Sequence, residues 1–516
     1  LGLAINGVSD LGLGVSGNIV LRSGSELKAG TVLLGGTSGA NQVVIEDNAS
    51  IDTRGLGEAG WTLENGFLLD TVTRDASFVA VSNDTLSFGQ VVGEGSISIA
   101  DGASLQSDGT VALVGPGGVE LGDIRLTAGD LLLVVEDINI GEEAALAAAD
   151  EAGVLSPGWQ LSQTILDGLL RPSEGDGFGS LRLQASNSIN FLGDVTLDTF
   201  DPATGESSAS ISLISPAIYG LGDEGDTATI RTDRLVLAGL IYGVRRNIST
   251  IDWFVAEPGP VIPDGAGTGA GAFRVEAREV LFGDGEGAFL NPATNLERPQ
   301  LMLGFEDVEF AASERITSNY TGSLSVYREQ TGEDTFVGGN LALTTALLTG
   351  EAGSNMAYNA GGNLVVGRPD DAGDVDLTDQ DFGAQIRLSG GTVDIAGTIA
   401  APSGLLEVRS EGDLTLADGA VIDLSGRPVE FFEEVCHGFG GDLVLTSLGG
   451  SILQSAGSTI DVSADYSDSG TITAIANDGR VDLAGTLISG HSPAEDDEDS
   501  ADYRGGSGDV RAGEIV

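Results

Sequence analysis

Short phrases that close an apolar run recur along this chain and constrain its fold more than any other feature. The stretch GDLTLADGAVIDLSG at 412–426 contains two runs of alternating apolar residues around a turn. Its ending returns, with variations, as IDTRG at 51–55, VDIAG at 393–397, IDVSA at 460–464 and VDLAG at 481–485. Because side chains alternate along a strand, Ile422 and Leu424 point to one side and Asp423 to the other. The repetition predicts many similar short strands separated by turns.

The spacing of these strands favours a solenoid over other all-β folds. A propeller blade would repeat at about 40–50 residues with aromatic signatures, which the phrases lack. Coils of about 20 residues, lengthened in places by loops, fit a parallel β-helix in which each strand pairs with its equivalent in the next coil. Ile422 and Leu424 would then stack on equivalent residues. Burial of each aliphatic side chain would stabilise the fold by about 1.5–3 kcal/mol. Outward aspartates such as Asp423 would keep the faces wet and discourage aggregation.

The composition agrees with a folded and strongly acidic protein. Hydrophobic residues make up 41% of the 516 residues, which is more than a disordered chain of this charge would normally contain. The chain has 78 acidic and 23 basic residues, and its formal charge is −55. Such a charge repels phosphate groups, so we expect no binding to nucleic acid or to anionic membrane surfaces.

The sequence shows no membrane-spanning segment, no signal peptide and no pair of cysteines. No apolar run approaches the roughly 18–20 residues of a membrane-spanning helix, so we predict no transmembrane segment. The chain begins at Leu1 without the features of a signal peptide, and we expect it to be a processed or trimmed piece of a longer protein. Cys436 is the single cysteine, which excludes an intramolecular disulfide framework.

Two kinds of segment interrupt the strand pattern. The alanine-rich run at 141–153 and the run at 160–177 predict short helices. Pro258, Pro260 and Pro263 predict a long surface loop. The predicted organisation is β-helix coils over 1–140, a helical excursion over 141–177, coils over 178–230, an irregular excursion with strands over 231–310, and coils over 311–516 with an acidic loop at 491–509.

Two segments resemble a known family. AALAAADEAG…GFGSLRLQASNSINFLGDVTL at 144–197 and GRPVEFFEEVCHGFGGDLVLTSLGGSILQSAGSTIDVSA at 426–464 are similar to filamentous-haemagglutinin-type exoproteins, the large bacterial passengers of two-partner secretion. The resemblance implies a right-handed parallel β-helix that is exported through a dedicated outer-membrane transporter and is secreted or displayed at the cell surface as an adhesin. Its ligand would lie on another cell surface or in the extracellular matrix. The family's Asn-Pro-Asn-Gly-Ile type secretion motif and an Arg-Gly-Asp triplet do not occur, so this piece resembles the shaft of such a protein.

Three functions follow from these observations. The first is a non-enzymatic β-helical shaft that mediates attachment or surface structure. The second is a subunit that self-associates into an extracellular filament, sheath or surface layer, since uncovered solenoid ends are sticky edges. The third is a carbohydrate-active β-helix enzyme, which the sequence disfavours: His437 and His491 are the only histidines, and Lys28 is the only lysine.

One acidic segment is a candidate calcium site. DDAGDVDLTDQD at 370–381 brings Asp374, Asp376, Asp379 and Asp381 close together, and carboxylate oxygens are the ligands that Ca²⁺ prefers. The segment does not match the EF-hand loop or the repeats of calcium-binding β-rolls. In a chain this acidic, such a cluster is more often a solvated loop. No other cofactor is expected.

Two further groups of residues have a functional and a structural interpretation. Cys436 beside His437 could act as a nucleophile, although an isolated thiol is more often a packed bystander. The aromatic residues could form a sugar-stacking platform, although packing of loops on the coils is the more frequent role. These aromatic residues are Trp61, Trp159, Trp253, Phe431 and Phe432.

Overall fold

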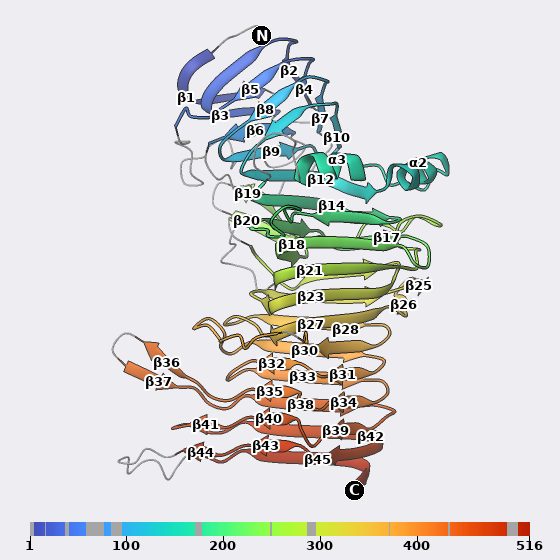
Figure 1. The fold of residues 1–516 in the computed structure, drawn as a ribbon, viewed down its shortest axis with the longest axis vertical. Helices are drawn as coiled ribbons and strands as arrows, with labels where there is room; N and C mark the ends of the chain where they lie inside the picture. Colours follow the sequence, from blue (N-terminus) through green and yellow to red (C-terminus); the bar gives the residue numbers. More distant parts are fainter. Residues whose placement is uncertain are drawn as a thin grey trace. The chain divides into compact units, whose positions relative to one another are not determined.

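The computed structural model describes residues 5–15, 17–36, 41–57, 77–83, 95–170, 178–247, 250–285, 296–370, 372–431, 434–492 and 504–515. The chain divides into two compact units. Unit 1 comprises Leu1–Gly269 and Asp284–Gln300, and unit 2 comprises Ala270–Gly283 and Leu301–Val516. Most of the described residues of both units lie in strands, which confirms the predicted all-β class (Figure 1).

Most described strands of unit 2 pair in parallel in three columns, through which the chain passes in a fixed order. The first column contains β24 (Thr321–Tyr327), β28 (Asn355–Ala360), β30 (Gln385–Gly390), β33 (Leu405–Ser410), β38 (Asp442–Ser447), the start of β42 (Thr471–Leu483) and the start of β45 (Ser507–Ile515). The second contains parts of β21 (Gly271–Phe282), β23 (Phe305–Ser318) and β27 (Asn340–Leu348), then β29 (Leu364–Gly367), β31 (Val393–Ile395), β34 (Leu414–Leu416), β39 (Ile452–Gln454) and the end of β42. The third contains the ends of β21, β23 and β27, then β32 (Thr398–Ala400), β35 (Val421–Asp423), β40 (Thr459–Asp461) and β43 (Thr486–Ile488).

Buried aliphatic side chains stack in register along these columns. In the third column Ile399, Ile422 and Ile460 are paired in consecutive coils, and none of them is exposed. The predicted stacking of Ile422 is therefore confirmed, and Leu424 is buried as well. Each coil thus contributes one layer to a continuous apolar interior, which no single coil could bury alone.

Unit 1 follows the same rule with three sets of paired strands. The longest ladder contains β1 (Ile5–Val15), β3 (Glu26–Gly36), β6 (Phe78–Ser82), β9 (Thr110–Val114), β12 (Asp130–Gly141), β14 (Ser180–Leu192), β16 (Ser210–Ile214) and β18 (Thr227–Ala238). A second contains β2 (Ile19–Leu21), β4 (Gln42–Ile45), β7 (Ser96–Ile99) and β10 (Gly118–Leu121). The third contains β5 (Ser50–Asp52), β8 (Ser104–Gln106) and β11 (Arg125–Thr127), and β15 (Val195–Asp198) and β17 (Ala217–Leu221) extend the later coils.

Strand β6 departs from the uniformly parallel coils predicted for 1–140. It pairs antiparallel with β3 on one side and with β9 on the other, so it occupies one rung in the reverse direction. All of its residues are buried, and Phe78 and Ala80 belong to an apolar core cluster with Leu33 and Ala112. Parallel and antiparallel strands have the same alternation of side chains, so the sequence pattern does not distinguish them.

The helical excursion of unit 1 contains α2 (Glu143–Glu151), β13 (Trp159–Ser162) and α3 (Gln163–Leu170). Leu146 and Ala149 of α2 pack against Leu192. The side-chain amide of Gln163 at the start of α3 bonds both the N–H and the carbonyl of Thr196, each at 2.9 Å. The excursion therefore covers part of the backbone edge of β15.

The stretch 231–310, predicted to be irregular, contains long strands. β18, β21, β22 (Arg298–Leu303) and β23 pass through it, together with the antiparallel hairpin β19 (Ile241–Asn247) and β20 (Thr250–Val255). The prolines that suggested irregularity fall in one connection between β20 and β21, where they interrupt no ladder. In the predicted acidic loop 491–509, residues 493–503 lie outside the described part, and β45 begins at Ser507.

Candidate functional site

The connections from the third to the first column of unit 2 form what we call the loop corner. From β29 onward these connections are 368–384, 401–404, 424–441, 462–470 and 489–506, so their lengths differ widely. The connections at the other two corners of the same coils contain only a few residues each. In solenoids, insertions that gather on one face often mark the binding face. The loop corner is therefore the candidate functional site.

Two of the recurring phrases, IDLSG and IDVSA, open this corner, whereas VDIAG and VDLAG end strands of the second column. Asp423 and Asp461 are paired in the third column. Asp423 Oδ1 accepts hydrogen bonds from the N–H and the hydroxyl of Ser425, at 3.0 and 2.6 Å. Asp461 makes the same two bonds with Ser463, at 2.8 and 2.6 Å. In IDLSG and IDVSA the aspartate and serine thus form a turn that leads the chain out of the strand.

The acidic loop 368–382 takes the place of a third-column strand. Leu348 of β27 pairs directly with Ile399 of β32, although a full coil separates them in sequence. At this position Arg368 Nη1 donates to the carbonyl of Ala346 at 3.1 Å and to Thr398 Oγ1 at 3.3 Å. Its guanidinium therefore bridges the two coils where a strand is missing.

Asp381 folds back from this loop into the protein. It is only 1% exposed, and its Oδ2 forms an ion pair with Arg315 Nη2 at 2.7 Å. The same oxygen accepts hydrogen bonds from the N–H of Thr378 at 2.6 Å and from its hydroxyl at 3.0 Å. Asp381 thus anchors the loop and is directed away from solvent.

The four aspartates of the predicted calcium site are not assembled around a common point. Asp374 is fully exposed and contacts Arg368 at 3.3 Å, while Asp376 and Asp379 are also exposed. All four lie in the described part of the chain, in which no three His, Cys, Asp or Glu residues are placed to hold a metal ion. The ion pair with Arg315 withdraws Asp381 from the other three aspartates.

The hairpin β36 (Pro428–Phe431) and β37 (Glu434–His437) is the most prominent element of the loop corner (Figure 1). Within the described residues, its two strands pair only with one another. Val435 is 52% exposed and Phe439, just beyond the hairpin, is 56% exposed. The ring of His437 meets the ring of Tyr466 edge-on, with centroids 4.7 Å apart.

The hairpin and the acidic loop meet at their bases. Arg427 Nη1 donates to the carbonyls of Thr378 and Asp381, at 3.3 and 3.4 Å. A side chain on Gly438 would lie 2.5 Å from Ser403 Oγ and 2.9 Å from the Phe382 ring, so glycine is needed for this close approach. The two excursions therefore form one continuous surface.

The other candidates from the sequence are dispersed. Cys436 and His437 are consecutive on β37 and point to opposite faces, so the imidazole is not positioned to take a proton from the thiol. Trp159 is buried in β13, and Trp253 lies in β20. Trp61, Phe432 and the side chain of Phe431 lie outside the described part of the structure.

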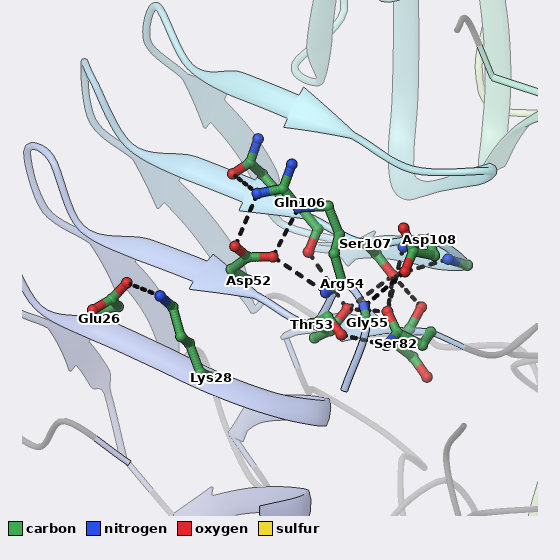
Figure 2. Close-up of polar contacts among 12 residues, drawn as sticks. Glu26, Lys28, Asp52, Thr53, Arg54, Gly55, Ser82, Gln106, Ser107 and Asp108 are labelled. Carbon is green, nitrogen blue, oxygen red and sulfur yellow. Dashed lines mark hydrogen bonds and ion pairs between the residues drawn. The ribbon is translucent and has the colours of Figure 1, made fainter. Parts of the chain in front are cut away.

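Unit 1 contains a group of polar side chains that the sequence did not indicate (Figure 2). Arg54 binds both carboxylate oxygens of Asp52 at 2.9 Å and also donates to Gln106 at 2.9 Å. This pairing holds the pKa of Asp52 below its usual value. Thr53 Oγ1 donates to Asn83 Oδ1 at 2.8 Å, directly after the antiparallel strand β6. Because these groups bond one another, the network fixes the path of the chain around β6.

A second polar group in unit 1 surrounds a buried carboxylate. Asp137 is 6% exposed and accepts hydrogen bonds from Ser188 at 2.8 Å and from Asn187 at 3.2 Å. Burial raises the pKa of this carboxyl above its ordinary value, against the opposing effect of the two hydrogen bonds. Two residues further along the same paired strands, the buried Asn190 donates from Nδ2 to Oδ1 of the buried Asn139 at 2.9 Å.

Comparisons with known proteins found no similar protein from which a role for these features could be taken. No family model matches the chain, and neither the curated proteins nor the solved structures contain a match. Within the described residues, neither helix is long and apolar enough to span a membrane.

Proposed function

We propose that this chain is a non-enzymatic section of a large bacterial adhesin of the filamentous-haemagglutinin type. In this proposal each unit is a section of a right-handed parallel β-helix, and the loop corner of unit 2 is its binding face. Parallel strands joined within one sheet are connected in the right-handed sense in about 98% of cases, which supports the handedness. Export through an outer-membrane transporter and display at the cell surface belong to the same proposal.

One observation carries this proposal. The three columns of unit 2 keep their register from β30 to β43, while the connections at one corner vary from the short turn 401–404 to a protruding hairpin. A constant stack with variable loops separates the stiff support from the surface that contacts a ligand. An adhesin shaft requires this division.

The proposal is tested by shortening one connection. Residues 424–441 are replaced by the sequence of Ala401–Gly404, which joins the same two columns one coil earlier. The control variant removes instead the hairpin β25–β26 (Glu329–Val337), which lies outside the loop corner. Beads coated with each protein are then scored for attachment to a panel of host cells and matrix proteins.

We expect wild-type beads and the control to attach, and the shortened variant to attach weakly although its circular dichroism is unchanged. If the wild-type protein attaches to no surface in the panel, the adhesin proposal is wrong. If the shortened variant attaches as well as the wild type, the binding face lies elsewhere.

A filament subunit is the second candidate, because the final described coils expose apolar side chains. Leu487 and Ile488 on β43 are 44% and 39% exposed, and Val510 on β45 is 39% exposed. Such a surface could pack against a further coil or against another molecule. Size-exclusion chromatography with light scattering, with and without Ca²⁺, distinguishes the two: a monodisperse monomer in both conditions contradicts the filament.

A further inference from the structure

We infer that the β36–β37 hairpin binds an extended cationic polypeptide, which adds as a third strand to the outer edge of β37. The inference rests on the proposed binding role of the loop corner and specifies the chemistry of the partner. It depends on three features of the described residues: an unpaired strand edge, an exposed apolar group beside it, and a negative field around both.

The unpaired edge belongs to β37. The register pairs Pro428 with His437 and Val429 with Cys436, and the described residues provide no further strand next to the hairpin. β36 begins with a proline, which has no N–H to donate, whereas β37 contains no proline and directs every second N–H to its outer edge. A free edge of this kind recruits an extended peptide through main-chain hydrogen bonds.

The apolar group lies beside that edge. Val435 is 52% exposed, Phe439 is 56% exposed and Tyr466 is 39% exposed. Tyr466 has a φ of 57°, a backbone conformation that residues other than Gly, Asn and Asp seldom adopt. Its ring rests against His437 of β37, so this strained turn holds an aromatic surface next to the strand. Alternate apolar side chains of an added strand would pack here.

The charge around the hairpin selects the partner. Asp465 and Asp468 beside Tyr466 are exposed, and Asp374 in the neighbouring loop is fully exposed. Arg315 and Arg368 are paired with Asp381 and Asp374, whereas Arg427, bonded to two carbonyls, and the exposed Arg504 keep their charge. The hairpin sequence adds Glu430, Glu433 and Glu434, so acidic groups remain in excess around it. A second copy of this chain, at a formal charge of −55, would be repelled. A segment rich in lysine or arginine would be attracted.

The test measures fluorescence anisotropy of a labelled alternating lysine–valine peptide with the full chain. We expect saturable binding that weakens as salt is added, and no binding of the matched glutamate–valine peptide. A lysine–valine peptide that is N-methylated along one edge cannot form the new ladder and should not bind. The double substitution Val435→Ser and Phe439→Ser should raise Kd about tenfold or more. Val337→Ser, at a valine that is 43% exposed on the β25–β26 hairpin, should leave Kd unchanged.

Several outcomes would overturn the inference. These are equal binding of the N-methylated peptide, equal binding of the acidic peptide, displacement of the peptide by a neutral polysaccharide, or self-association lost in the double variant. The result is also distinguishable from that for the proposed function. Peptide binding without bead attachment supports the strand-addition site alone, whereas attachment without peptide binding retains the adhesin and rejects this partner.

Discussion

Arg315 and Asp381 form an ion pair across 66 residues of sequence and close the acidic loop against the coils of unit 2. The side chains are 14% and 1% exposed, so neither charge is well solvated. Replacing Arg315 by Leu leaves the carboxylate of Asp381 buried without its cation. We expect the free energy of unfolding to fall by about 3–5 kcal/mol, measured by chemical denaturation.

The double variant Arg315→Leu and Asp381→Asn removes both charges and should recover part of this loss. Arg511→Ala is the matched control, since the pair between Arg511 and Asp509 is exposed and should contribute no measurable stability. If Arg315→Leu unfolds at the same denaturant concentration as the wild type, the ion pair does not hold the loop.

Gln454 interrupts an apolar column. It is 3% exposed and lies between Leu416 and Leu483 in the second column. Neither its side-chain oxygen nor its nitrogen has a hydrogen-bond partner. An unsatisfied buried amide is unfavourable, so Gln454→Leu should stabilise the protein by about 1–3 kcal/mol in chemical denaturation.

The reverse substitution one coil earlier is the control for this prediction. Leu416→Gln places an amide at the neighbouring position of the same column and should destabilise the protein by a similar amount. A destabilised Gln454→Leu variant would show that the amide has a role that its surroundings do not reveal.

Asp137 should make stability fall with rising pH. Burial raises the pKa of its carboxyl in the folded state. Below the unfolded-state pKa of about 3.9, the group is protonated in both states and has no effect. As pH rises from there to the folded-state pKa, the unfolded chain ionises first and the free energy of unfolding falls. Asp137→Asn should therefore be more stable than wild type at neutral pH and equal to it at low pH. A gap between the two proteins that is constant with pH would contradict this prediction.

The carboxylate of Glu143 should make stability depend on pH in the opposite direction, so that stability falls as pH falls. The hydroxyl and N–H of Thr164 and the residue's own N–H bond this carboxylate and lower its pKa to about 2, with the N–H of Thr164 at 3.0 Å from Oε1. The contribution of this carboxylate to stability is complete above its unfolded-state pKa of about 4.3. It is lost as pH falls toward the folded-state pKa. We expect α2 and α3 to separate in this range, seen as loss of amide protection at Thr164. In Glu143→Gln the protection should be weaker and independent of pH.

The columns could be predicted because they depend on local alternation. Ile422 has an isoleucine at the paired position one coil earlier, Ile399, and one coil later, Ile460, so burial of one aliphatic face implies stacking. The helix predicted over 141–153 forms as Glu143–Glu151, and Gly153 follows in the left-handed conformation with a φ of 71°. Both features are encoded within a few residues.

The remaining features depend on partners distant in sequence. The reversed direction of β6 depends on which edge of the ladder it meets. Asp381 has the same neighbours in sequence as the exposed aspartates of its loop, and only Arg315 distinguishes it. The loop corner becomes visible only when the columns are aligned, because the uneven spacing of the phrases hides the fact that most extra residues fall between the same two columns.

The turn Ala401–Gly404 and the hairpin excursion 424–441 join equivalent strand ends in neighbouring coils. Foreign sequence inserted at the turn would therefore meet the same endpoints that already accept a much longer segment, and it should leave the rungs on either side intact. Segments of very different length can therefore occupy this corner between fixed strand ends. If this corner is the proposed binding face, its specificity could be rewritten during evolution, or in the laboratory for epitope display, without altering the scaffold that presents it.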